Sequence, residues 1–165
     1  MNIDVSYDRR EAFDAEYAFA DSPYGEMIGV FSSKGLCYLG FALPDRETVL
    51  AHVKAIYPNM RLAESVTERD IFVPDLTLHL IGTPFQIDVW RALLEVGRGE
   101  TICYSELARR AGHAEAVRAA ASAVGDNPIT LLVPCHRIVR RDGSIGQYYW
   151  GSEMKRRILS DEGAI

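Results

Sequence analysis

The sequence changes character near residue 80, and this change constrains the fold more than any other feature. Before that point, glycines divide the chain into short runs rich in aromatic and β-branched residues. After it, apolar residues recur at helical spacing between proline and glycine boundaries. Runs of the first kind are typical of strands, and bounded apolar stripes are typical of amphipathic helices. The 165 residues therefore predict an α/β protein with a sheet-bearing part and a helical part.

The first part predicts a small antiparallel sheet followed by one helix. Glycines interrupt residues 17–43 repeatedly, which is typical of a meander, and Pro44 ends it. Asp45 is suited to cap a helix that runs to Pro58, because apolar residues behind it recur at helical spacing. Residues 59–80 show no strong period and are expected to form a strand or a linker.

The second part predicts three helices. Thr83 and Pro84 have the pattern of an N-cap followed by proline at the first helical position, and the apolar stripe behind them ends at Gly97. A short helix is expected over 105–111, capped by its first residue, and another over about 114–124. These last two helices, joined by a tight turn, predict a helix-turn-helix unit.

The last of these helices has almost no side-chain bulk. Its central residues are an arginine followed by five small residues: Arg118, Ala119, Ala120, Ala121, Ser122 and Ala123. Helix propensity explains alanines that pack against a neighbour, and for the helix alone this interpretation is preferred. The alternative is a slim helix that enters the DNA minor groove with the arginine as an inserted wedge.

A candidate nucleophile follows an apolar run. Asn127 begins a turn, residues 129–133 predict a buried strand, and Cys135 comes at its end next to His136. A cysteine reacts as its thiolate, so it needs a base or a positive environment. Adjacent side chains point to different sides of an extended backbone, which favours a bridging water between the two over direct contact. For this dipeptide alone, an inert buried cysteine is the preferred interpretation.

Charge is distributed unevenly. The net charge is -5, which argues against a nucleic-acid partner. However, residues 1–80 carry 7 basic and 13 acidic side chains, and residues 81–165 carry 11 basic and 10 acidic. Residues 137–157 have a local basic excess that suits an anion. The acidity therefore belongs to the first part, and a shallow salt dependence of any DNA binding is expected.

The cellular setting is suggested by two features. The three cysteines have no paired spacing, which favours a reducing cytoplasm. No signal-like segment or run of about 20 apolar residues occurs, so no membrane association is expected.

Cys37, His52 and His79 lack the spacing of zinc ligands, and no metal site is predicted.

Several motifs, in order, resemble the O6-alkylguanine-DNA alkyltransferases, also called methylated-DNA–protein-cysteine methyltransferases. The resemblance covers about residues 76–162, and the segment 146–155 is most similar to the alkyltransferase domain of the bacterial adaptive-response protein. Residues 1–75 match only in size and strand-helix pattern. The motifs are Gly82-Thr83-Pro84-Phe85-Gln86, Val89-Trp90, Gly99-Glu100-Thr101 with Tyr104, Ala116-Val117-Arg118-Ala119, Asn127-Pro128 and Val133-Pro134-Cys135-His136-Arg137-Ile138-Val139.

The resemblance implies an RNase-H-like N-terminal domain with its linker over 1–75 and a helical DNA-binding domain with a helix-turn-helix over 76–165. It implies DNA repair by direct reversal: a monomer without a cofactor binds the minor groove of double-stranded DNA and flips out O6-methylguanine. The methyl group then passes irreversibly to the protein, once per molecule. Alkyltransferase-like proteins, which bind such lesions without transfer because the cysteine is replaced, are the alternative; a cysteine hydrolase is poorly supported.

The resemblance also assigns residues. Cys135 is the acceptor, His136 and Glu162 form a water-mediated relay, Asn127 stabilises the turn, and Tyr104 rotates the phosphate and donates a hydrogen bond to the flipped guanine. A phenol suits the last role because the leaving guanine develops negative charge. The DNA-binding helix contributes Arg118, which fills the vacated base stack, with Ala119, Ala120, Ser122 and Ala123. The substrate pocket is formed by Ile138, Tyr148, Tyr149 and Trp150.

Two departures from the family pattern affect function. Gly125-Asp126 replaces small or basic residues at the end of the recognition helix, which removes a possible phosphate contact. Tyr149-Trp150 has more bulk than a serine-glycine pair at the pocket wall. We therefore expect large adducts such as benzyl to react more slowly than methyl.

Overall fold

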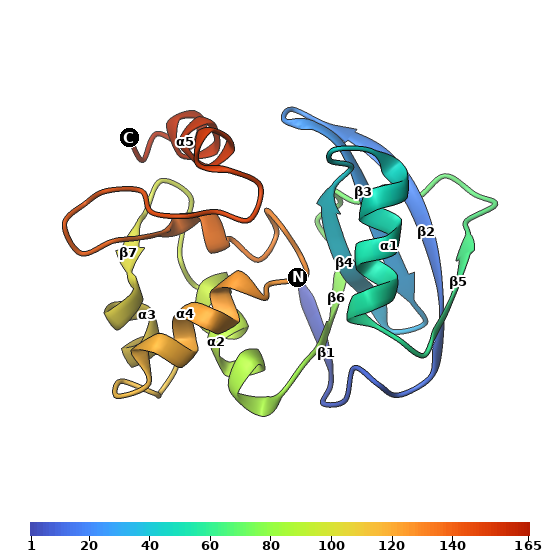
Figure 1. Ribbon diagram of the computed structural model, residues 1–165, viewed down its shortest axis with the longest axis horizontal. Helices are drawn as coiled ribbons and strands as arrows, with labels where there is room; N and C mark the ends of the chain where they lie inside the picture. Colours follow the sequence, from blue (N-terminus) through green and yellow to red (C-terminus); the bar gives the residue numbers. More distant parts are fainter. The chain divides into compact units, whose positions relative to one another are not determined.

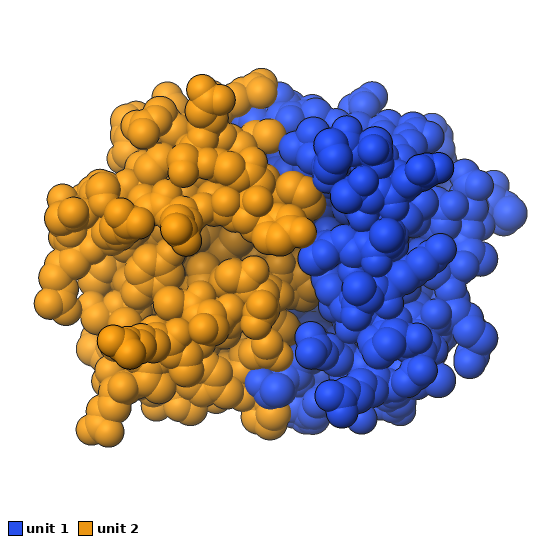
Figure 2. Space-filling view, in the orientation of Figure 1, with its two compact units in different colours: residues 1–83 blue, residues 84–165 orange.

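The computed structural model describes residues 1–165, which divide into two compact units, Met1–Thr83 and Pro84–Ile165 (Figure 2). The first unit contains a sheet and one helix, and the second is mainly helical (Figure 1). The α/β class predicted from the sequence is confirmed. Along the chain, the first unit ends at Thr83 and not at the expected residue 75, because the strand Thr77–Ile81 pairs within the first unit. No helix is both long and apolar enough to cross a membrane.

The sheet of the first unit has six strands in the order β1-β6-β4-β3-β2-β5. β2, β3 and β4 form the expected antiparallel meander, whereas β1 pairs with β6, β6 with β4, and β2 with β5 in parallel. The predicted small antiparallel sheet is therefore the centre of a larger mixed sheet. The bounds are β1 Asn2–Ser6, β2 Phe13–Ser22, β3 Gly25–Ser32, β4 Gly35–Phe41, β5 Met60–Glu64 and β6 Thr77–Ile81.

The helix of the first unit, α1 (Arg46–Ile56), begins where the sequence predicts it. The Asp45 carboxylate accepts a hydrogen bond from the Thr48 backbone N–H at 2.8 Å, so it satisfies one of the free donors of the first turn. At the other end, the buried Tyr57 hydroxyl donates to the Cys37 carbonyl of β4 at 2.6 Å. Both contacts fix the helix, which packs its apolar stripe against the sheet.

The second unit contains four helices, a short 3-10 helix and a two-stranded parallel ladder of β7 with β8. The first helix begins at Pro84 as predicted. The cap of the next helix lies two residues earlier than expected, because Cys103 rather than Ser105 occupies the N-cap position. The bounds are α2 Pro84–Leu94, β7 Ile102–Cys103, α3 Tyr104–Arg110, α4 Val117–Gly125, η1 Cys135–Arg137, β8 Ile138–Val139 and α5 Ser152–Asp161.

Trp90 of α2 fixes the end of α4. Its indole N–H donates to the Ala123 carbonyl at 2.9 Å, and the ring is buried. The Asn127 N–H, four residues after Ala123, bonds to the Val124 carbonyl instead. The indole therefore satisfies a carbonyl at the helix end that the chain itself leaves open.

We expect Trp90→Phe to lower the free energy of unfolding by about 1–3 kcal/mol, because a buried carbonyl loses its partner while most of the apolar area is retained. Urea unfolding monitored by circular dichroism measures this. Trp150→Phe, which removes an indole bond to the Thr130 hydroxyl at a less buried position, is the matched comparison. An unchanged unfolding midpoint for Trp90→Phe would show that water replaces the indole donor without cost.

Candidate active site

The segment before Cys135 is a series of turns, not the predicted buried strand. The Asn127 side chain causes this: its amide donates to the carbonyls of Ile129 and Val133 at 3.4 and 2.8 Å, and its oxygen accepts from the Ile129 N–H at 3.0 Å. These bonds replace the ladder bonds of a strand. Leu131 has a φ of 72°, the one positive value at a residue other than glycine, which marks how tightly the segment is folded.

Cys135 is the first residue of η1 and is half-buried. Burial raises the pKa of its thiol, and three influences oppose this: a hydrogen bond from Asn127, the positive charge of Lys155 and nearby backbone N–H groups. Tyr104 and Tyr148 also face the thiol: burial raises the pKa of both hydroxyls, and the negative charge of Cys135 raises it further. The Tyr148 hydroxyl is buried without a hydrogen-bond partner. The side chains of Asn127, Lys155, Tyr104 and Tyr148 therefore all interact with the Cys135 thiol.

His136 contacts a carboxylate through one of its ring nitrogens. Its Nε2 lies 2.8 Å from Glu162 Oε1, and both side chains are almost fully buried. Burial lowers the pKa of His136 although Glu162 opposes the shift, so the imidazole is neutral near pH 7. Facing a carboxylate, Nε2 carries the proton, and the lone pair is then on Nδ1, a buried atom without a hydrogen-bond partner. The ring is therefore held as a base.

Glu162 is fixed from a second side by Arg137. The guanidinium donates to both carboxylate oxygens at 3.0 and 3.1 Å and to the Val96 carbonyl at 2.6 Å. Burial alone would raise the pKa of Glu162, but the hydrogen bonds from Arg137 and His136 outweigh it and lower the pKa. The carboxylate is thus ionised at neutral pH and can accept from the histidine.

Lys155 is a buried cation beside the thiol. Only 1% of the residue is exposed, and its ammonium donates to the carbonyls of Ile138 and Gln147 at 2.6 and 3.2 Å. Burial lowers its pKa to about 8, while the negative charge of Cys135 acts in the opposite direction. The ammonium therefore joins β8 to the following loop and favours the thiolate at the same time.

We expect Lys155→Met to slow alkylation of Cys135 by iodoacetamide at neutral pH by roughly tenfold, because the loss of a nearby positive charge raises the pKa of the thiol by about one unit. The rate is measured against pH by intact mass. The rate of the variant should recover at higher pH, and Lys155→Arg, which keeps the charge, should lose less. Identical pH profiles for Lys155→Met and the unmodified protein would contradict the electrostatic role.

The predicted DNA-binding residues of α4 divide into two faces. Arg118, Ala119 and Ser122 are exposed, whereas Ala120 and Ala123 are buried within the unit. The small side chains of the buried pair therefore serve helix packing, as the propensity argument suggested. The slim, exposed stripe and the arginine remain available to a ligand.

The predicted pocket residues also differ in exposure. Ile138 is fully buried, Tyr148 faces the thiol, and Tyr149 is 62% exposed. The Trp150 indole donates to the Thr130 hydroxyl at 2.9 Å, so its ring is fixed, and it forms an edge contact with Tyr149. Arg137 and Lys155 are the site residues that the sequence reasoning did not assign a role. Their position in the basic segment was visible, but their burial was not.

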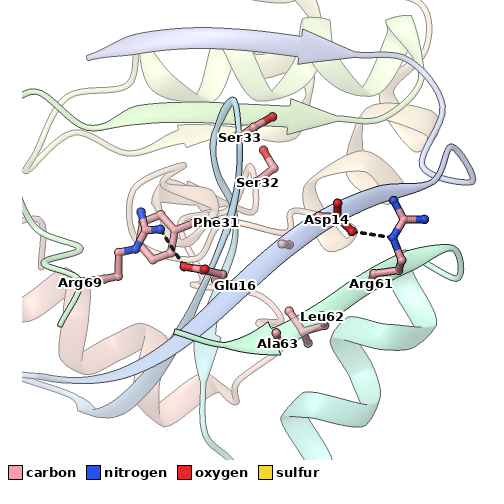
Figure 3. Close-up of a pocket in the computed structure, with 10 residues that line it drawn as sticks. Asp14, Glu16, Phe31, Ser32, Ser33, Arg61, Leu62, Ala63 and Arg69 are labelled. Atoms are coloured by element: carbon pink, nitrogen blue, oxygen red, sulfur yellow. Dashed lines mark hydrogen bonds and ion pairs between the residues drawn. The ribbon is translucent and has the colours of Figure 1, made fainter. Parts of the chain in front are cut away.

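A separate hollow in the first unit contains no comparable chemistry (Figure 3). Its carboxylates are paired: Asp14 with Arg61 and Glu16 with Arg69. The guanidinium of Arg69 also lies over the Phe31 ring. No group of three or more His, Cys, Asp or Glu side chains in the chain is arranged to hold a metal ion.

Comparisons with known proteins identify related sequences and structures. Residues 84–164 match the family described as "6-O-methylguanine DNA methyltransferase, DNA binding domain". The regulatory protein ada of Salmonella typhimurium is 35% identical over 162 residues, which cover 88% of this chain but 45% of that protein; this chain thus spans about half the length of that relative. The inducible methylated-DNA–protein-cysteine methyltransferase of Bacillus subtilis is 32% identical over 78% of this chain and 79% of its own. The crystal structure of Mycobacterium tuberculosis OGT in complex with DNA has a TM-score of 0.66 at 30% identity, covering 90% of this chain and 93% of that one.

Proposed function

Because the chain belongs to the methylated-DNA–protein-cysteine methyltransferase family, we propose that it repairs DNA by direct reversal, moving the methyl group of O6-methylguanine to Cys135. The observation that carries this proposal is the arrangement of a half-buried thiol, a base-forming histidine and a fixed carboxylate within the unit that matches the family. The crystallised relative bound to DNA supports DNA as the partner.

In the proposed reaction, Nδ1 of His136 takes the thiol proton through one water, and Glu162 holds the ring and stabilises the imidazolium. The thiolate attacks the methyl carbon in line, the carbon–oxygen bond breaks, and the electron pair stays on guanine. Tyr104 donates a proton to the departing base, which limits its negative charge. The product is a thioether at Cys135 with no leaving group, so each molecule acts once.

The finer architecture belongs to the same proposal. We infer that α3 and α4 form a helix-turn-helix that binds the minor groove through its exposed stripe, with Arg118 in the space left by the flipped nucleotide. The backbone at Cys135, Ile138 and Tyr149 would read the edge of the base. The first unit would be an RNase-H-like domain that faces away from DNA, and the protein would act as a monomer.

The direct test is to incubate the protein with duplex DNA carrying one O6-methylguanine and to weigh the intact protein. We expect a gain of one methyl group per molecule, mapped to the peptide that contains Cys135, and no second turnover. Tight binding to the lesion without a change of mass would instead indicate an alkyltransferase-like binding module.

We expect O6-benzylguanine in DNA to react roughly tenfold or more slowly than O6-methylguanine. Trp150 is held by Thr130, so a larger adduct must displace packed groups, which costs about 1–3 kcal/mol. Single-turnover rates with the two otherwise identical duplexes measure this. Equal rates would show that the Tyr149 and Trp150 bulk lies away from the adduct.

A further inference from the structure

The basic segment that follows Cys135 contains two exposed arginines whose side chains form no ion pair or hydrogen bond within the protein. Arg137 and Lys155 are hydrogen-bonded within the active site. Arg140 and Arg156, by contrast, form no ion pair and no side-chain hydrogen bond, and both are exposed. Their guanidinium groups are therefore free to bind an external anion.

Both arginines line the same hollow. It lies between the loop that follows β8 and the start of α5, and none of its lining side chains is a carboxylate. Asp142, the neighbouring acid on the loop, accepts through Oδ1 from the Ser144 N–H at 2.9 Å and the Ser144 hydroxyl at 2.7 Å, and its charge also interacts with Arg140. The hollow therefore contains two guanidinium groups, and the charge of Asp142 acts on Arg140 from the side.

A third cation lies beneath this hollow. A Cβ placed on Gly146 would lie 3.5 Å from Arg140 Cγ and 3.9 Å from Lys155 Nζ, so both cationic side chains border the same glycine. Burial is the main cause of the lowered pKa of Lys155, and the charge of Arg140 lowers it further. Like charges held close together repel each other, and a bound anion would reduce that cost.

The position of the hollow indicates which anion it takes. The loop leaves the active site through β8, which directly follows η1, and returns to it at Tyr148, whose hydroxyl faces the thiol. A flipped nucleotide that reaches Cys135 stays joined to its own backbone, so phosphates must pass near this loop. The fork of a guanidinium matches phosphate oxygens in geometry and charge.

Building on the proposed function, we propose that the hollow between Arg140 and Arg156 binds a backbone phosphate of the DNA that carries the lesion. The bound phosphate also keeps Lys155 protonated, and this charge favours the thiolate of Cys135. DNA binding at the loop therefore prepares the nucleophile for the base that the same DNA delivers.

The test is the salt dependence of DNA affinity for the variant Arg140→Gln/Arg156→Gln. Fluorescence anisotropy measures binding to an undamaged duplex and to the same duplex with one O6-methylguanine. The slope of log K against log salt should fall by about 1, which at 0.1 M salt corresponds to a loss of about eightfold for one phosphate contact. Both duplexes should lose affinity alike, because phosphate contacts do not read the base.

Three controls make the result decisive. Arg9→Gln/Arg10→Gln removes the same charge from the first unit and should leave the slope unchanged. Arg140→Lys/Arg156→Lys keeps the charge and should retain most of the slope, and equal urea midpoints establish that the variants are folded. Inorganic phosphate at constant ionic strength should compete with DNA for the unmodified protein more than for the Gln variant.

An unchanged slope in the Gln variant overturns the proposal, even if inorganic phosphate still binds the unmodified protein, because the anion would then come from solution. An equal loss in the variant of the first unit also overturns it, because the effect would be one of net charge. The proposed function is tested separately by the mass of the methylated protein, so a protein that binds with the predicted slope but gains no methyl refutes the chemistry alone.

Discussion

Cys135→Ser is expected to abolish methyl transfer while DNA binding persists. A serine hydroxyl in the same place ionises far less readily than a thiol, and it is a much weaker nucleophile towards a methyl carbon than a thiolate is. The bonds of Asn127 to the carbonyls of Ile129 and Val133, which shape the preceding turn, do not involve the sulfur. Intact mass after incubation with methylated duplex measures the transfer, and anisotropy on the same duplex measures the binding.

The two other cysteines provide matched controls. Cys37 is fully buried in β4, where burial raises its pKa to about 12, so it stays a thiol. Cys103 is only partly buried, and a hydrogen bond with the Ser105 hydroxyl is the main cause of its lowered pKa. Cys103→Ser should transfer methyl at the normal rate. A persistent methyl gain in Cys135→Ser that disappears in the double variant with Cys103→Ser would assign the acceptor role to Cys103.

Glu162→Gln is expected to lower the free energy of unfolding by roughly 3 kcal/mol. The substitution keeps the shape of the side chain but leaves the mostly buried Arg137 guanidinium without its counter-charge. It also removes the carboxylate that fixes the proton on Nε2 of His136, so methyl transfer should slow as well. Urea unfolding measures the first effect. Glu106→Gln, which removes an exposed carboxylate paired with two arginines, should change stability little.

The same residue predicts a pH dependence. The folded pKa of Glu162 lies below its ordinary value of 4.5, so its contribution to stability is present above that pH and is lost as the pH falls through the lower folded value. The unmodified protein should therefore lose stability on acidification below pH 4.5, and Glu162→Gln should lose less over the same range. Parallel stability curves for the two proteins would show that another carboxylate controls acid unfolding.

Local sequence patterns predicted the helix boundaries and the meander, but they did not predict which distant strands pair. The cap at Asp45 and the helix start at Pro84 are written in adjacent residues, and the structure has both. The pairing of β1 with β6 joins residues that are more than seventy positions apart, and the periodicity of neighbouring residues does not predict such a pairing.

In the active site, too, contacts between distant residues could not be predicted from local sequence patterns. The cysteine, the histidine and the distant glutamate were assigned through the motifs, and the structure places Glu162 on His136. The apolar run before Cys135 predicted a strand because hydrophobicity alone does not distinguish a strand from buried turns. The Asn127 side chain decides between them through bonds to backbone groups up to six residues away. Similarly, the burial of Lys155 depends on two carbonyls from other segments.

The outer strand β5 has a consequence for how the protein behaves at high concentration. It is five residues long, lies at the edge of the sheet and carries Arg61 and Glu64. Short, charged edges discourage sheets of neighbouring molecules from joining into aggregates. Under the proposed reaction one molecule is consumed per lesion, so the capacity for repair depends on how many folded molecules are present, and this edge limits their loss to aggregation.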